Sequence, residues 1–201
     1  MKRPILAIAS VIVLATVVRL FAADTPAPAS PPAAAPAPAL AIKSDTPGEL
    51  KFTTHNSVYN AEGSFASWRV VKSDIPGGDI TKGTVTLEVD IASVTEKSEK
   101  LSAHLRTPDF FDAANFQKAT ITISGAKPAG EKKYNATAAI DLHGIKGTTP
   151  VAFEVVSDKP LTIKGTAKLD RTAFKIGEPY DAANKYAPLN EVAITLTAKL
   201  E

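Results

Sequence analysis

The side chains best suited to chemistry in this chain are three histidines, His55, His104 and His143. No two of them have a metal-ligand spacing such as His-x-x-x-His, so the sequence contains no zinc motif. It also lacks a Gly-x-Ser-x-Gly elbow, and with no cysteine it has no thiol nucleophile. Histidines that bond backbone or carboxylate groups at strand ends explain the pattern better than catalysis does. We therefore predict a protein that is not an enzyme and that needs no metal and no cofactor.

Charged residues gather beside one of these histidines. Arg106 and Asp109 are three residues apart and follow His104, and a second pair, Asp170 and Arg171, is adjacent in sequence. Two interpretations remain open. The charges form ion pairs that fix this segment to the rim of a sheet, or His104, Arg106 and Asp109 lie at a channel mouth and contact a polar head group.

The same segment contains three phenylalanines and a helix start. Thr107 can cap a helix, Pro108 suits its first position, and Asp109 favours the positive helix end. These signals predict two helices, over residues 96–106 and 108–115.

A capping box at Ser93-Val94-Thr95-Glu96 is expected to start the first of these helices. The inward side of the pair should cover one end of the fold, either as a simple plug or as a hydrophobic lid over a channel. The side chains assigned to it are Leu105, Phe110, Phe111 and Phe116.

Strands with period-two alternation make up the rest of the domain. Regular alternation occurs over residues 84–91, 120–123, 135–142, 151–155, 161–169 and 192–200, and less regular strands are expected at 50–54 and 63–71. Turns such as Pro76-Gly77-Gly78-Asp79 and Lys127-Pro128-Ala129-Gly130 favour antiparallel hairpins.

About eight antiparallel strands must pair their edges in a barrel or split into a sandwich. We predict an all-β fold, a closed antiparallel eight-stranded barrel with a short helical insertion. Its inward residues are mostly small, which favours room for a ligand. Trp68, the only tryptophan, fits a core position better than a ligand contact, although its ring would suit either. The predicted apolar channel consists of Phe65, Trp68, Leu87, Val89, Leu105, Phe110, Phe111, Phe116, Ile121, Ile123, Ile140 and Phe153.

The amino-terminal segment predicts export. Lys2 and Arg3 precede an apolar run over residues 5–18, and Ala22-Ala23 follows, as in a secretory signal peptide. The run is shorter than the roughly 20 apolar residues that span a bilayer, although an uncleaved anchor over residues 1–23 remains the alternative. Residues 24–45 are rich in Pro and Ala and predict an extended linker, which would suit a membrane tether.

The formal charge of +2 depends on the leader. Removing residues 1–23 takes away three cations and leaves 20 basic and 21 acidic side chains, a net charge of −1. The domain at residues 46–201 therefore has no electrostatic basis for binding nucleic acid. With no disulfides, its stability must come from core burial.

Several short motifs of this domain resemble the YceI family. They are Phe52-Thr53-Thr54-His55, Gly63-Ser64-Phe65, His104-Leu105-Arg106, Asp109-Phe110-Phe111-Asp112, His143-Gly144, Asp170-Arg171, Phe174 with Ile176-Gly177, and Asn190-Glu191-Val192. The resemblance implies a lipocalin-like barrel that carries or sequesters an amphiphile such as an isoprenoid quinone or a polyprenol.

Two function classes follow from these observations. The first is an exported lipid-binding protein, periplasmic or secreted, or anchored in the membrane by its amino terminus. The second is a non-carrier envelope stress or scaffolding module whose barrel is filled by its own side chains. The lipid and the oligomeric state stay open, with a homodimer as one option.

Overall fold

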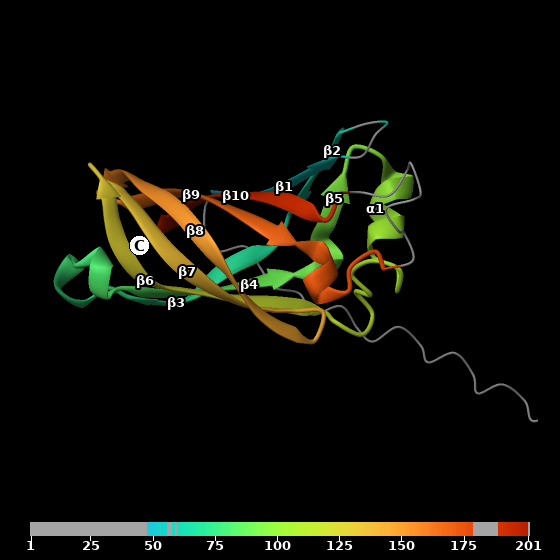
Figure 1. Ribbon diagram of the computed structural model, residues 1–201, viewed down its shortest axis with the longest axis horizontal. Helices are drawn as coiled ribbons and strands as arrows, with labels where there is room; N and C mark the ends of the chain where they lie inside the picture. The colour runs from blue at the N-terminus through green and yellow to red at the C-terminus, as the bar shows by residue number, and fades with distance from the viewer. Residues whose placement is uncertain (1–47, 56–57, 59, 179–188, 201) are drawn as a thin grey trace, which may run out of the picture. The chain divides into compact units, whose positions relative to one another are not determined.

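The computed structural model describes residues 48–55, 58, 60–178 and 189–200. These residues form one antiparallel sheet, one α-helix and short 3₁₀ turns (Figure 1). The strands are β1 (Gly48–His55), β2 (Asn60–Phe65), β3 (Trp68–Asp74), β4 (Thr84–Asp90), β5 (Val94–Glu96), β6 (Lys118–Gly130), β7 (Lys133–Leu142), β8 (Ile145–Asp158), β9 (Leu161–Asp170) and β10 (Glu191–Leu200), and the helix is α1 (Glu99–Leu105).

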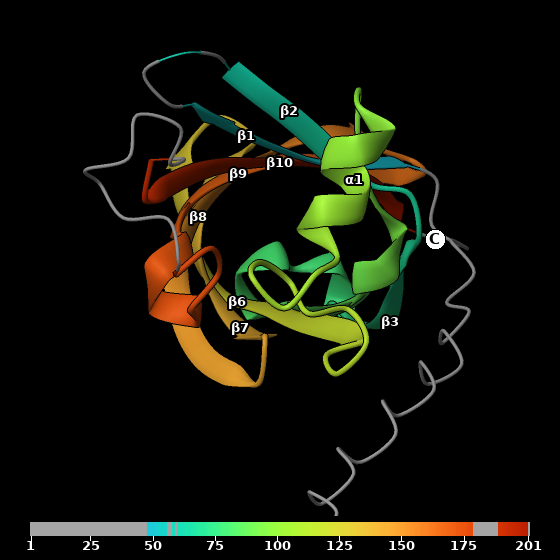
Figure 2. The same ribbon diagram turned by 90° about the vertical axis from the view of Figure 1, so that its right-hand side faces the viewer.

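The sheet curls around an interior that is seen end-on in Figure 2. Its strand order is β3-β4-β6-β7-β8-β9-β10-β1-β2-β5, and every neighbouring pair is antiparallel. The all-β antiparallel fold is as predicted, but the closed eight-stranded barrel is wrong. Among the described residues the sheet has ten strands, and β3 and β5, at the two ends of the order, do not pair with each other.

Two strands are added to the predicted eight. The strand expected at residues 63–71 is divided into β2 and β3, and β5 forms where a helix-capping box was expected. The chain leaves the sheet at Ala66 and Ser67, which separates β2 from β3. The 3₁₀ turn η3 (Ile91–Ser93) likewise separates β4 from β5. Asp90 caps this turn by accepting a hydrogen bond from the Ala92 amide at 3.0 Å, and burial raises the pKa of the Asp90 carboxyl.

Local hydrogen bonds hold the sheet together where the strands break. The Ala66 amide donates to the Ser93 carbonyl at 3.1 Å, and the Asp90 amide donates to the Ser67 carbonyl at 3.0 Å. The Ser67 amide donates to Ser93 Oγ, also at 3.0 Å. The two bends, at Ala66–Ser67 and at η3, form a seam in the sheet. Individual hydrogen bonds join this seam, and no regular ladder of strand pairing crosses it.

The alternation in the sequence predicts the inner face well. On β4, Leu87 and Val89 are each 2% exposed. Leu87 pairs with Ile121 of β6, and Ile121 pairs with Ile140 of β7. Side chains opposite each other in a ladder share a face, so these apolar residues line one interior.

One hairpin differs from its prediction. Residues 127–130, expected as a turn, belong to β6, and the chain reverses at Glu131 and Lys132 instead. Lys132 has φ 53°, the left-handed conformation that a tight turn needs. The other predicted turn is present, because Gly77 and Gly78 have φ of 60° and 74°.

The helical segment is shorter than predicted. Helix α1 begins after Ser98, whose hydroxyl accepts a hydrogen bond from the Leu101 amide at 3.4 Å. Ser93 is not the cap, because its hydroxyl donates to the Asp90 carbonyl at 2.6 Å. The capping motif three residues ahead of Glu96 therefore belongs to η3 and not to the helix.

The second predicted helix, over residues 108–115, does not form. The amides of Phe110 and Asp112 both donate to the Thr107 carbonyl, and the Ala113 amide donates back to the Arg106 carbonyl. Asp112 has φ 44°, which ends any right-handed helix. The segment is a run of tight turns that folds back on α1.

An ion ladder lies on the outer face of the sheet. Glu88 of β4 accepts hydrogen bonds from Arg69 of β3 at 3.0 Å and from Lys118 of β6 at 3.1 Å. These two cations hold the pKa of the Glu88 carboxyl below its usual range.

The predicted leader (1–23), the predicted linker (24–45) and residues 179–188 lie outside the described residues. Within the described part of the chain, no helix is long and apolar enough to cross a membrane.

Candidate ligand cavity

The curled sheet encloses a cavity of about 450 Å³. Inward side chains of β1, β4 and β6–β10 form its wall, and nearly all of them are aliphatic or aromatic. Gly63 makes room for one of them, because a Cβ at this position would stand 2.2 Å from the ring of Phe52. The alternating strands therefore build an apolar container that their own side chains do not fill.

Helix α1 and the turns after it cover one end of this cavity (Figure 2). Leu101, His104 and Leu105 of α1 line the cavity together with Phe110 and Phe111. The Phe110 ring meets the His104 ring edge-on with centroids 5.0 Å apart. Phe110 is 8% exposed, whereas Phe111 is only half-buried, so the two rings are not equivalent.

The Phe111 ring packs edge-on against Phe65 of β2, with centroids 5.7 Å apart. Phe65 in turn contacts Phe52 of β1 at 5.8 Å. We call α1 and the turns after it the covering segment. This row of rings connects the covering segment to the sheet wall.

The opposite end of the wall is completed by the β3–β4 connection. Its two isoleucines, Ile75 and Ile80, line the cavity. Asp79 holds the 3₁₀ turn η2 (Ile80–Lys82) by accepting hydrogen bonds from the Thr81 hydroxyl at 2.6 Å and the Thr81 amide at 3.0 Å. These bonds lower the pKa of the Asp79 carboxyl. The connection is thus a folded apolar cover and not a bare hairpin turn.

Most side chains of the predicted apolar channel line this cavity. They are Phe65, Leu87, Val89, Leu105, Phe110, Phe111, Ile121, Ile123, Ile140 and Phe153. Trp68 and Phe116, which the sequence assigned to the channel wall, do not line this cavity.

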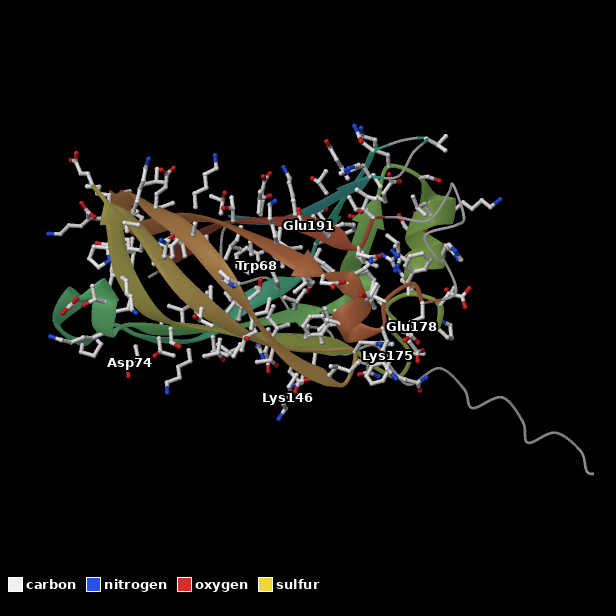
Figure 3. The ribbon with its side chains drawn as sticks, in the orientation of Figure 1. Trp68, Asp74, Lys146, Lys175, Glu178 and Glu191 are labelled. Carbon is white, nitrogen blue, oxygen red and sulfur yellow. The ribbon has the colours of Figure 1, made fainter. Side chains whose placement is uncertain are left out.

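Trp68 lies inside the sheet, as Figure 3 shows, while Asp74 of the same strand lies outside. It pairs with Val89 and is 1% exposed. Neighbouring side chains therefore cover the indole completely, and it fills the core without bordering empty space.

Phe116 lies over the β7–β8 turn instead. Its ring packs against that of His143 with centroids 4.4 Å apart. Gly144, which has φ 72°, leaves room for this ring, since a Cβ there would stand 2.8 Å from it. The phenylalanine therefore anchors the covering segment from outside the cavity.

The three predicted head-group residues are separated. His104 lines the cavity, but Arg106 and Asp109 do not. Arg106 donates from Nε to the Ala92 carbonyl at 2.9 Å and from Nη2 to the Val94 carbonyl at 2.8 Å. Asp109 is exposed, and its carbonyl accepts a hydrogen bond from the Gly177 amide at 2.9 Å. Arg106 Nη1 also lies 3.8 Å from a carboxylate oxygen of exposed Glu99. Arg106 thus fixes the covering segment to the rim, as one of the two sequence interpretations expects, with two carbonyls and Glu99 as partners instead of Asp109.

Arg171 is a cavity residue that the sequence did not predict. It is 5% exposed, and its Nη1 donates to the carbonyls of Ile176 at 2.7 Å and Gly177 at 3.0 Å. Its Nε donates to the Leu189 carbonyl at 3.2 Å. Burial lowers the pKa of this guanidinium. Its Nη2 donates to Asn190 Oδ1 at 3.3 Å. Its shortest bonds go to backbone carbonyls, which leave no signal in the side-chain pattern.

No group of described residues could hold a metal ion. His55 and His104 line the cavity, but the Nδ1 of His143 contacts the Phe174 carbonyl at 3.0 Å on the turn described above. Thr54, Glu96 and Leu101 line the cavity as well, and no prediction included them. Thr54 follows the alternation of Leu50 and Phe52, which is the signal that could have identified it.

A curled antiparallel sheet around an apolar cavity, covered at one end by a helix, defines a barrel-like protein with an internal ligand-sized chamber. The chain belongs to the YceI-like domain family, which matches residues 45–200. A UPF0312 protein from Vibrio vulnificus is 30% identical over 78 residues, which cover 39% of this chain and 41% of that protein. The chain thus spans about two fifths of the length of the curated relatives it matches.

Three solved structures have the same fold. BcnA of Burkholderia cenocepacia is 21% identical, with a TM-score of 0.68 over 77% of this chain and 96% of that one. The YceI protein of Campylobacter jejuni is 19% identical, with a TM-score of 0.59 over 73% and 89%. A polyisoprenoid-binding domain from Saccharophagus degradans, implicated in plant cell wall breakdown, is 16% identical, with a TM-score of 0.54 over 75% and 91%.

Proposed function

We propose that this chain binds an isoprenoid-like amphiphile, with the hydrocarbon tail in the cavity and the carrier acting without catalysis. The observation that carries the proposal is the apolar cavity of about 450 Å³, a volume within the roughly 300–1,000 Å³ of small-molecule sites. Family membership supports it, as does the polyisoprenoid-binding domain among the structures of the same fold. Burial of the tail would supply most of the affinity, at about 25 cal/mol per Å².

The lining supports an uncharged head group, as in an isoprenoid quinone or a polyprenol. Arg171 is the one Lys or Arg among the described cavity residues, and its guanidinium already donates to backbone carbonyls. A phosphate buried here would lack the cationic partner that a buried charge needs.

The alternative was a scaffolding module with a filled barrel. Its own side chains should then pack the interior to the density of a protein core. The cavity supports the carrier over this module, because the inward residues of β9 become small after Ile163, at Gly165 and Ala167.

The cavity volume also sets a capacity. A methylene occupies about the volume of a water molecule, roughly 30 Å³, so the 450 Å³ hold about 15 non-hydrogen atoms. This corresponds to about three isoprene units.

The test has two parts. Mass spectrometry of an organic extract from the natively purified protein should identify an isoprenoid-like lipid. Delipidated protein should then bind farnesol, a fifteen-carbon isoprenoid alcohol, with saturable 1:1 stoichiometry. If the protein binds neither farnesol nor a hydrocarbon of the same length, and its extract contains no lipid, the carrier proposal is wrong and the scaffolding module takes its place.

We propose further that the chain is exported, and that residues 1–23 are either removed or kept as an anchor. The apolar run and the Pro/Ala-rich linker support this proposal. Amino-terminal sequencing of protein recovered from envelope fractions distinguishes the two cases. Intact protein confined to the cytoplasm would contradict both.

A further inference from the structure

We infer that Thr54 forms a polar subsite within the apolar cavity, where its hydroxyl binds the uncharged oxygen of a ligand head group. This inference rests on the proposed function and adds the group that recognises the head.

The position of Thr54 follows from the alternation of β1. Leu50 and Phe52 are 5% and 7% exposed, and Thr54 continues the same inner face. It pairs with Ala61 of β2, and both residues line the cavity. Glu96 of β5 pairs with Gly63 of β2, which pairs with Phe52, and β5 contacts α1. Thr54, two residues beyond Phe52 on β1, therefore lies toward the end that α1 covers.

The hydroxyl of Thr54 is buried and has no hydrogen-bond partner among the described residues. A hydroxyl withdrawn from water without a partner destabilises a fold, and valine would fill the same shape without this cost. Two charged groups that line the cavity are engaged. Glu96 accepts from the Ser98 amide at 2.7 Å, and Arg171 donates to carbonyls. The hydroxyl of Thr54 is therefore placed for a partner that the folded chain does not provide.

The chemistry of that partner is constrained. A threonine hydroxyl can donate one hydrogen bond and accept others, so either an alcohol or a carbonyl oxygen satisfies it. A phosphate would bring charge into a cavity whose one lining guanidinium is already engaged. The subsite thus selects a neutral oxygen, such as that of a polyprenol or a quinone.

Ser67 offers a matched comparison. Its hydroxyl is also buried without a partner among the described residues, but Ser67 lies at the seam between β2 and β3 and does not line the cavity. Removing this hydroxyl should change stability alone. The same change at Thr54 should alter ligand selection as well.

The experiment compares Thr54→Val and Ser67→Ala with the wild type, using farnesol and farnesene, a hydrocarbon of the same length without oxygen. Thr54→Val should bind farnesol about tenfold more weakly, as expected for one hydrogen bond, and bind farnesene unchanged. The unliganded variant should unfold at the same or a higher temperature. Ser67→Ala should bind both ligands as the wild type does, and Thr54→Ser should keep its selection for the alcohol.

Two results overturn the inference while leaving the carrier proposal intact. One is equal loss of farnesol and farnesene affinity in Thr54→Val. The other is a marked loss of stability in unliganded Thr54→Val, because the hydroxyl would then have a structural partner. If the wild type binds neither ligand, the proposed function and this subsite fail together.

Discussion

Replacing Gly165 by leucine should block the cavity without harming the fold. Gly165 lies on the inner face of β9 and lines the cavity, and a Cβ added there would stand 3.5 Å from the Phe153 Cβ, an ordinary contact. The four side-chain carbons of leucine would take about 120 Å³, at roughly 30 Å³ per non-hydrogen atom, out of the 450 Å³. A tail that fills the cavity would lose about four buried carbons.

The expected cost follows from this displaced volume. At about 0.8 kcal/mol per buried methylene, the variant should lose about 3 kcal/mol of binding free energy, roughly 100-fold in affinity for farnesol. Stability should stay the same or rise, since glycine inside a strand is unfavourable by about 0.5–1 kcal/mol relative to alanine.

Isothermal titration with farnesol, beside thermal unfolding, measures both effects. Ala152→Leu is the matched control, because Ala152 is exposed on the outer face and pairs with Thr166. A folded Gly165→Leu protein with unchanged affinity would show that the tail does not pass this part of the cavity, and the reasoning would fail.

Three further outcomes are expected. Phe110→Ala should cost about 3–5 kcal/mol of unfolding free energy, because this ring is buried against His104 and beside Gly177. Phe111 is only half-buried, so Phe111→Ala should cost less unfolding free energy and should speed ligand release. Denaturant unfolding and ligand off-rates decide between them, and the reverse ranking would show that Phe110 is the movable lid. Arg106→Ala should lower stability by about 1.5–3 kcal/mol and leave the preference for farnesol over farnesene unchanged, since its guanidinium binds carbonyls outside the cavity; a changed preference at native stability would place it at the head group. Glu88→Gln should lose under about 1 kcal/mol at neutral pH. The two flanking cations lower the pKa of Glu88 in the folded state. Its contribution to the free energy of unfolding is therefore fully present above the unfolded-state pKa, and it is lost as the pH falls through the folded-state pKa. The stabilities of wild type and variant should thus converge in acid. A stability difference that persists in acid would contradict that assignment.

The sequence by itself determined which side chains point inward. Alternation along β4 and β10 is a local property of extended backbone, since successive side chains leave opposite faces. Leu87, Val89 and Leu196 could therefore be assigned to the interior without knowledge of their neighbours, and all three line the cavity. The motifs at residues 109–112 and 170–171 likewise resemble the family to which the chain belongs.

Only the tertiary structure decided which inward side chains border empty space. Trp68 and Val89 pair across one ladder and are nearly equally buried, yet Val89 lines the cavity and Trp68 does not. The difference depends on how many neighbours surround each ring or branch in three dimensions. Alternation along one strand carries no information about this.

The same limit applies to the polar groups and to closure of the sheet. Arg106 and Arg171 bind backbone carbonyls of segments that are distant or irregular, and a carbonyl is common to every residue, so no side-chain pattern reports it. The breaks at Ala66–Ser67 and at η3, which open the predicted barrel, depend on hydrogen bonds between those two bends. Long-range contacts of this kind exist only once the strands have come together. The sequence therefore predicted the wall of the chamber, whereas the structure alone located its seam and the buried hydroxyl of Thr54 that has no partner among the described residues.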